Sequence, residues 1–259
     1  MILKFNMRYF KKAGYLLVLF FGFLSCKDTE MNNPIIVAHR GAMGYEMENT
    51  IASVEKALEL EAPMIEIDVF QIASGELVVF HDDTMERLSN GTGPIVDYDW
   101  ESLSKIVLEG GHRIPLLSEV LEVVQGKAKL NIELKGPHTA LPVLALIEPL
   151  VASGAWDLED IVLSSFDWPQ LLQARLQNSS IPIAVLTEED PLEAVEMARS
   201  VQAVAINAYF KNLSVEIVQN IQQSGFQVFA WTVNRPQDLA AIKAMGVDGI
   251  ITNFPDRRF

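Results

Sequence analysis

The chain has little positive charge, a single cysteine and no glycine-rich dinucleotide loop, and each shortage excludes a class of protein. Its 259 residues carry 20 Lys and Arg against 34 Asp and Glu, a formal net charge of −14. Nucleic-acid binding requires a basic surface, so we expect no nucleic-acid partner. Cys26 is alone, which excludes an intramolecular disulfide. With 49% apolar and 21% charged residues, the length suits one large α/β domain with a sizeable core.

The chain also lacks an N-terminal apolar run long enough to span a bilayer, which takes about 20 residues. Ala13–Leu24 is uncharged but shorter, and it follows a basic start made of Lys4, Arg8, Lys11 and Lys12. This is the layout of a secretory signal. Cys26, directly after Leu24 and Ser25, resembles the lipidated cysteine of a bacterial lipoprotein signal, although Phe23 replaces the usual smaller aliphatic residue.

We therefore expect residues 1–25 to be a signal peptide that is cleaved before Cys26. The mature protein would be an exported bacterial lipoprotein, held at the membrane by a lipid anchor and located in the periplasm or on the cell surface. Plain secretion with an incidental cysteine is the alternative. Cleavage would remove four positive charges and no acidic residue, so the mature chain would be still more acidic.

From Asn32 onwards, strand-like and helix-like segments alternate without a visible domain break. Ser214 is a plausible helix cap, and Gly225 and Gly246 are typical helix stops. This pattern predicts a (β/α)₈ TIM barrel over residues 32–259. A doubly wound open sheet is the alternative, but no dinucleotide-binding loop supports it. The predicted strands are 35–39, 64–70, 129–134, 161–166, 182–187, 203–208, 227–232 and 249–253.

One additional strand, residues 77–80, follows strand 64–70 too closely for a helical crossover. We expect a β-hairpin that turns at Ser74-Gly75, with residue 73 facing residue 76, which would place His81 opposite Asp68. Residues 83–115 then show little periodicity and contain several glycines, so they predict an insertion at the mouth of the barrel.

Ionisable residues interrupt three otherwise apolar strands. The run Ile35–Ala38 leads directly into a histidine and an arginine, whereas the other two strands carry a charge on every second residue. Alternate strand residues face the same side, so each charged pair shares one face. A solvated sheet face would explain one such strand, but three predict a polar cluster at one end of the barrel. The residues are His39, Arg40, Glu66, Asp68, Glu133 and Lys135.

Six short motifs occur in order across residues 35–257: His39-Arg40-Gly41, Glu48-Asn49-Thr50, Glu66-x-Asp68, His81-Asp82, Glu133-x-Lys135 and Gly249–Asn253. Together they resemble the glycerophosphodiester phosphodiesterase family. Arg87 and the loop Gly91-x-Gly93 also match the insertion of that family. The resemblance implies a (β/α)₈ barrel that uses a metal ion and two histidines to cleave glycerophosphodiesters to glycerol phosphate and an alcohol.

By that resemblance, the metal ligands are Glu66, Asp68 and Glu133. Three carboxylates without cysteine or histidine ligands also predict a hard cation, Mg²⁺ or Ca²⁺. The ion would hold the phosphate oxygens and neutralise charge in the transition state. Arg40 and Lys135 would bind the phosphate, which explains how an acidic protein could hold an anion.

His39 and His81 are suited to be the general acid and base, because histidine titrates near neutral pH. The sequence does not assign either role to one histidine, and either could be structural. His112 and His138 are expected in exposed loops, outside the site.

Four further residues have two interpretations each. Glu48 and Asn49 could contact substrate or cap the helix that begins near Thr50, and we expect a mixed role. Phe166 and Trp231, at strand ends, could line the pocket or pack inside the barrel. Met47 stands where proline is common in the family, and Asn253 where aspartate is common; neither matches a metal or catalytic residue.

The leading hypothesis is metal-dependent hydrolysis of deacylated phospholipids such as glycerophosphocholine or glycerophosphoethanolamine. A phospholipase D-like activity on lysophospholipids is the enzymatic alternative, and a non-catalytic binding lipoprotein is the other. The intact set of two histidines and three carboxylates argues against the last. The sequence leaves open the head group, the metal and the oligomeric state.

Overall fold

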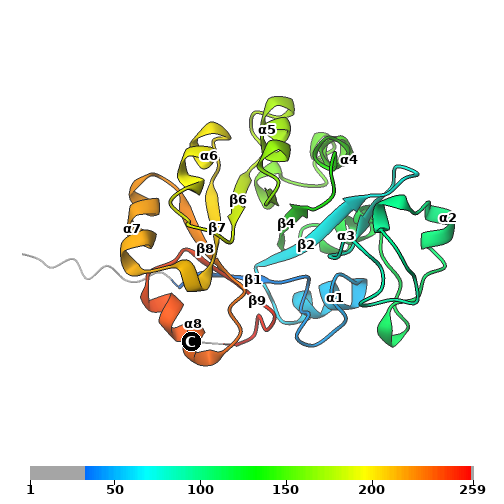
Figure 1. The fold of residues 1–259 in the computed structure, drawn as a ribbon, viewed down its shortest axis with the longest axis horizontal. Helices are drawn as coiled ribbons and strands as arrows, with labels where there is room; N and C mark the ends of the chain where they lie inside the picture. The colour runs from blue at the N-terminus through cyan, green and yellow to red at the C-terminus, as the bar shows by residue number, and fades with distance from the viewer. Residues whose placement is uncertain (1–32, 258–259) are drawn as a thin grey trace, which may run out of the picture. The chain divides into compact units, whose positions relative to one another are not determined.

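Eight parallel strands close into a ring in the computed structural model, which describes residues 33–257 (Figure 1). β1 pairs with both β9 and β2, so the sheet has no open edge within the ring. The predicted (β/α)₈ barrel is therefore confirmed. Around the ring, the strands are β1 (Ile35–Ala38), β9 (Gly249–Thr252), β8 (Gln227–Trp231), β7 (Ala205–Tyr209), β6 (Ile183–Thr187), β5 (Ile161–Ser165), β4 (Lys129–Leu134) and β2 (Met64–Gln71).

Seven helices surround the ring (Figure 1): α1 (Ile51–Glu59), α3 (Leu117–Val124), α4 (Ala140–Ala152), α5 (Trp168–Gln177), α6 (Ala194–Ser200), α7 (Val215–Gln223) and α8 (Pro236–Ala244). The Ser214 side chain accepts a hydrogen bond from Ile217 N–H at the start of α7, which confirms the predicted cap. Among residues 33–257, no helix is long and apolar enough to cross a membrane. The predicted signal peptide and Cys26 lie outside the described residues.

The main core lies between the ring and these helices. On β2, Ile65, Ile67 and Val69 face outward and are fully buried, so the alternate residues must face the barrel interior. The barrel interior near the amino ends of the strands is apolar and holds the Phe229 ring, which lies against Gly249. A Cβ at position 249 would lie 2.1 Å from that ring, so only glycine fits there.

The extra strand β3 (Leu77–Val79) lies outside the ring and pairs antiparallel with β2. The predicted register is wrong by one residue. The N–H of Ile72 donates to the carbonyl of Glu76, so the turn contains three residues rather than two. Phe80 consequently lies opposite Asp68, and its N–H donates to the Asp68 carbonyl. A shift of one residue exchanges the two faces of a strand, so Phe80, not His81, faces the side of Asp68.

The predicted insertion, residues 83–115, is present between β3 and α3 and has a small core of its own. Phe70, Phe80, Met85 and Ile95 are buried together in it, beyond the end of the ring. The insertion contains α2 (Trp100–Leu103) and the 3₁₀ turns Ile95–Asp97 and Glu109–Gly111. Two further 3₁₀ turns occur at Leu158–Asp160 and Phe210–Asn212.

Candidate active site and metal centre

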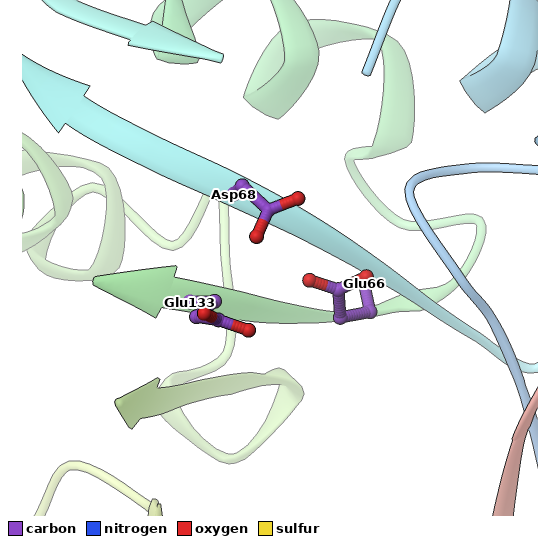
Figure 2. Close-up of side chains that lie close together, drawn as sticks. All are labelled: Glu66, Asp68 and Glu133. Carbon is purple, nitrogen blue, oxygen red and sulfur yellow. The ribbon is translucent and has the colours of Figure 1, made fainter. Parts of the chain in front are cut away.

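Three carboxylates meet inside the mouth of the barrel. Glu66 and Asp68 come from β2, and Glu133 comes from β4, where it pairs directly with Asp68 in the strand register. Figure 2 shows the three side chains gathered over these two neighbouring strands. Each offers one oxygen atom, and these atoms all lie within 4.8 Å of one another. The sequence-predicted ligand set is thus brought together.

The electrostatics of this cluster suit a bound cation. All three side chains are buried, and burial together with the charge of Asp68 raises the pKa of Glu133 to about 7. Burial and both neighbouring carboxylates raise the pKa of Glu66 well above its ordinary value. One Glu66 oxygen, Oε1, is buried without a hydrogen-bond partner. An unpaired buried carboxylate is costly, and a hard divalent ion bound by oxygen ligands would remove that cost, so these residues fit a metal site.

The loop between β1 and α1 orients two of the three carboxylates. The side chain of Asn49 donates from Nδ2 to Asp68 Oδ2 at 2.8 Å, and its Oδ1 accepts from the Asp68 backbone N–H. The backbone N–H of Arg40 donates to Glu66 Oε2 at 2.9 Å. Arg40 and Asn49 have φ angles of 50° and 57°, in the left-handed region that asparagine tolerates better than most residues. The sequence suggested Asn49 as a substrate contact or helix cap and did not predict that it orients Asp68.

Two cations lie beside the carboxylates at the predicted positions. Arg40 Nε is 3.4 Å from Asp68 Oδ2, and Lys135 Nζ is 3.0 Å from Glu133 Oε1. Lys135 is also 4.0 Å from Asp68 Oδ1. Both cations are mostly buried, so their charges act at short range with little screening by solvent. They place two positive charges beside the acidic cluster, which suits the binding of a phosphate group.

His39 follows β1 and is held by Asn253, which follows β9. The Nδ1–H of His39 donates to Asn253 Oδ1 at 2.8 Å, because an amide oxygen can only accept. The Nε2 atom therefore carries the lone pair, and it lies 3.9 Å from Glu66 Oε2. Burial, followed by the charge of Arg40, lowers the pKa of His39 to about 4, so the ring is neutral at pH 7. The sequence did not predict this contact between Asn253 and His39.

His81 is oriented by its neighbour. Its Nδ1–H donates to Asp82 Oδ1 at 2.6 Å, and Arg87 of the insertion binds both oxygens of Asp82. Hydrogen bonds from Arg87 lower the pKa of Asp82 to about 2, although partial burial opposes the shift, so this carboxylate stays charged. The arrangement therefore places a fixed negative charge behind His81.

The Glu48 side chain is hydrogen-bonded to two arginines from different parts of the chain. Its Oε1 accepts from Arg40 at 2.7 Å and from Arg87 at 2.8 Å, so it connects the β1 loop to the insertion. The helix-capping interpretation of Glu48 is wrong, because Thr50 caps α1 by accepting from Ser53 N–H. Sequence reasoning noted Arg87 only as a family match. Its contacts with Asp82 and Glu48 appear only in the folded chain.

A cavity lies beside these residues, and Phe166 and Trp231 line its apolar side. Their rings meet edge to face with centroids 5.4 Å apart, and Trp231 Nε1–H donates to the Asn207 carbonyl. The cavity measures about 80 Å³ and also contacts both histidines and Glu66. His112 and His138 do not line it, as expected from their loop positions.

A larger cavity of about 540 Å³ lies at the opposite end of the barrel. It opens where small residues such as Ala184 and Ala205 leave the interior unfilled. The carboxylate cluster and both histidines lie at the other end, at the carboxyl ends of the strands, where barrel enzymes place their catalytic groups. The smaller cavity is therefore the candidate active site.

The proteins most similar to this chain in sequence and fold include several phosphodiesterases. Residues 39–257 match the glycerophosphoryl diester phosphodiesterase family. The chain is 34% identical over 232 residues to a glycerophosphodiester phosphodiesterase of Caldanaerobacter subterraneus subsp. tengcongensis, covering 86% of this chain and 95% of that protein. It is also 34% identical over 236 residues to one of Bacillus altitudinis, with 86% and 95% covered. An Oleispira antarctica phosphodiesterase, solved in complex with the product sn-glycerol-3-phosphate, superposes with a TM-score of 0.79 at 27% identity, covering 86% of this chain and 94% of that one. The chain therefore belongs to the glycerophosphoryl diester phosphodiesterase family and is a phosphoric diester hydrolase.

Proposed function

We propose that this phosphodiesterase cleaves deacylated glycerophosphodiesters to glycerol phosphate and an alcohol, with His39 and His81 as the acid–base pair. The observation that carries this proposal is the meeting of both histidines with Glu66 and Glu133 around one cavity. The presence of glycerol phosphate in the Oleispira antarctica relative supports the same product here.

The cationic side chains hold the phosphate. Arg40 offers paired N–H donors that match two phosphate oxygens, and Lys135 adds a point charge. Both already sit against the carboxylates, so they are positioned before substrate arrives. A Mg²⁺ or Ca²⁺ ion held by Glu66, Asp68 and Glu133 would supply further charge neutralisation at the phosphate.

The different environments of the two histidines support different roles for them. His39 is neutral, with its Nδ1–H occupied by Asn253, so Nε2 can accept the proton of the nucleophile. That nucleophile is either water or the neighbouring hydroxyl of the glycerol half. His81 is hydrogen-bonded through Nδ1 to Asp82, which orients its ring at the cavity, and we propose that it donates a proton to the leaving alkoxide. We therefore propose His39 as the general base and His81 as the general acid.

The activity is tested by measuring glycerol phosphate release from several glycerophosphodiesters, with a chelator and metal add-back. We expect turnover that is lost with the chelator and restored by Mg²⁺ or Ca²⁺. Glu133→Gln should weaken metal affinity, whereas the conservative change Glu122→Gln, on the surrounding helix α3, should have no effect. Full activity in the chelator, or no glycerol phosphate from any diester with added metal, would contradict the proposal.

We also propose that the mature protein is a lipoprotein anchored through Cys26, and thus exported and membrane-attached. The support is the basic start, the short apolar run and the serine directly before the only cysteine. Cys26→Ala should leave catalysis intact but release the protein from the membrane fraction, because stable anchoring depends on the attached chains. Retention of Cys26→Ala in the membrane fraction would contradict the anchor.

A further inference from the structure

A second cavity of about 370 Å³ adjoins the candidate active site. The linings of both cavities include Trp231 and Thr232, so the two cavities adjoin at these residues. Tyr209 and Phe210, which follow one another at the end of β7, form its aromatic wall together with Trp231. Ring centroids are 5.5 Å apart for Tyr209 and Trp231, and 5.4 Å for Tyr209 and Phe210. This wall offers several π faces to a bound group.

The ammonium group of Lys211 lies over this aromatic wall. Lys211 Nζ lies 5.8 Å from the centroid of the Tyr209 ring and 5.9 Å from that of Phe210, within the range of a cation–π contact. Lys211 is exposed, and among residues 33–257 its ammonium group has no carboxylate partner. Its positive charge is therefore available to a group that enters the cavity.

The remaining charges of the cavity do not cancel this one. Arg235 is paired with Asp238, with Nε 2.6 Å from Oδ2. Arg235 also precedes α8, whose N-terminus has no side-chain cap and adds partial positive charge at the cavity wall. The residues that line this cavity thus carry a net positive charge of about one, which is the charge of Lys211.

We propose that this cavity receives the alcohol half of the diester, and that Lys211 selects alcohols carrying a negative charge over alcohols carrying a quaternary ammonium. The inference rests on the proposed function and adds its substrate preference. A quaternary ammonium would bind the same π faces that Lys211 occupies, and the two positive charges would repel each other. A carboxylate would be attracted by Lys211, and an uncharged polyol would fall between the two. Glycerophosphocholine is accordingly expected to be a poor substrate.

The test compares three glycerophosphodiesters that differ in the charge of the alcohol: 3-hydroxypropionate, glycerol and choline. For each, kcat/KM is measured on the full chain with bound metal. We expect the unmodified enzyme to prefer the 3-hydroxypropionate diester over the choline diester. In Lys211→Met, the ratio of these two values should fall about tenfold, because removal of one exposed charge changes each substrate by roughly threefold in opposite directions. The glycerol diester should change least.

Two control variants separate charge from structure. Lys211→Arg keeps the positive charge and should keep the preference. Lys127→Met removes the same charge from the turn before β4, at the opposite end of the barrel, and should leave all three values unchanged. High salt should reduce the preference of the unmodified enzyme, since the cavity is open to solvent.

Two results would overturn the inference while leaving the proposed function intact. One is a higher kcat/KM for the choline diester than for the 3-hydroxypropionate diester in the unmodified enzyme. The other is a Lys211→Met variant whose three values change equally or not at all. Failure of the metal-loaded enzyme to hydrolyse any of the three would instead overturn the proposed function, and the inference with it.

Discussion

Replacing Asn253 by aspartate puts a carboxylate where a neutral amide now accepts the His39 Nδ1–H. The acceptor oxygen lies 2.8 Å from Nδ1. Because residue 253 is far from His39 in the sequence, the substitution does not alter the segment that carries His39. Asparagine and aspartate are nearly equal in size. The substitution therefore tests the electrostatic consequence of this contact with little change in packing.

The magnitude follows from the present state of His39, whose pKa is lowered to about 4 chiefly by burial and then by Arg40. A carboxylate in hydrogen-bond contact stabilises the imidazolium, and an opposite charge at this range moves a pKa by about 1–3 units. The direction is upward, so the pKa of His39 in Asn253→Asp should lie at about 5–7. A general base must be neutral to act, so activity is lost as the pH falls through this value.

The assay is the pH profile of kcat/KM with saturating metal. We expect the acidic limb near pH 4 in the unmodified enzyme and about 1–3 units higher in Asn253→Asp. Asn253→Ala is the matched control, because it removes the hydrogen bond without adding charge; it should lower kcat without moving the limb upward. An acidic limb that stays in place in Asn253→Asp would refute the assignment of His39 as the base.

Three further predictions address the machinery and the fold. His39→Ala and His81→Ala should each lower kcat by about 10²–10⁴-fold. The double variant should be little less active than the single variant with the lower kcat, because both histidines act on the same bond-breaking event. Near-normal turnover in either single variant would contradict the mechanism. Asn49→Ala should lower metal affinity by about 10–100-fold, with activity recovered in excess metal, since it removes two hydrogen bonds to Asp68; unchanged metal titration would contradict this role. Gly249→Ala should lower the unfolding free energy by about 1–3 kcal/mol through its clash with Phe229, measured by denaturant unfolding; an unchanged midpoint would show that the ring moves without cost.

Much of the site could be predicted because strand geometry is local. Successive strand residues face opposite sides, so Glu66 and Asp68 had to share one face once 64–70 was a strand. The alternation of strands and helices then predicted a closed barrel, in which the carboxyl ends of all strands meet at one end. Glu133 and Lys135 reach the same place by the same periodicity. These inferences needed only side-chain direction and the order of elements.

Other features depended on how distant parts of the chain meet. The contact of Asn253 with His39 exists because β9 pairs with β1 and closes the ring, which brings together residues 214 positions apart. The link from Arg87 through Glu48 to Arg40 depends on how the insertion packs on β2 and β3. The hairpin register was missed because one hydrogen bond, from Ile72 to Glu76, decides between a two-residue and a three-residue turn. Local periodicity sets where each side chain points, whereas only the closed barrel sets which side chains it meets.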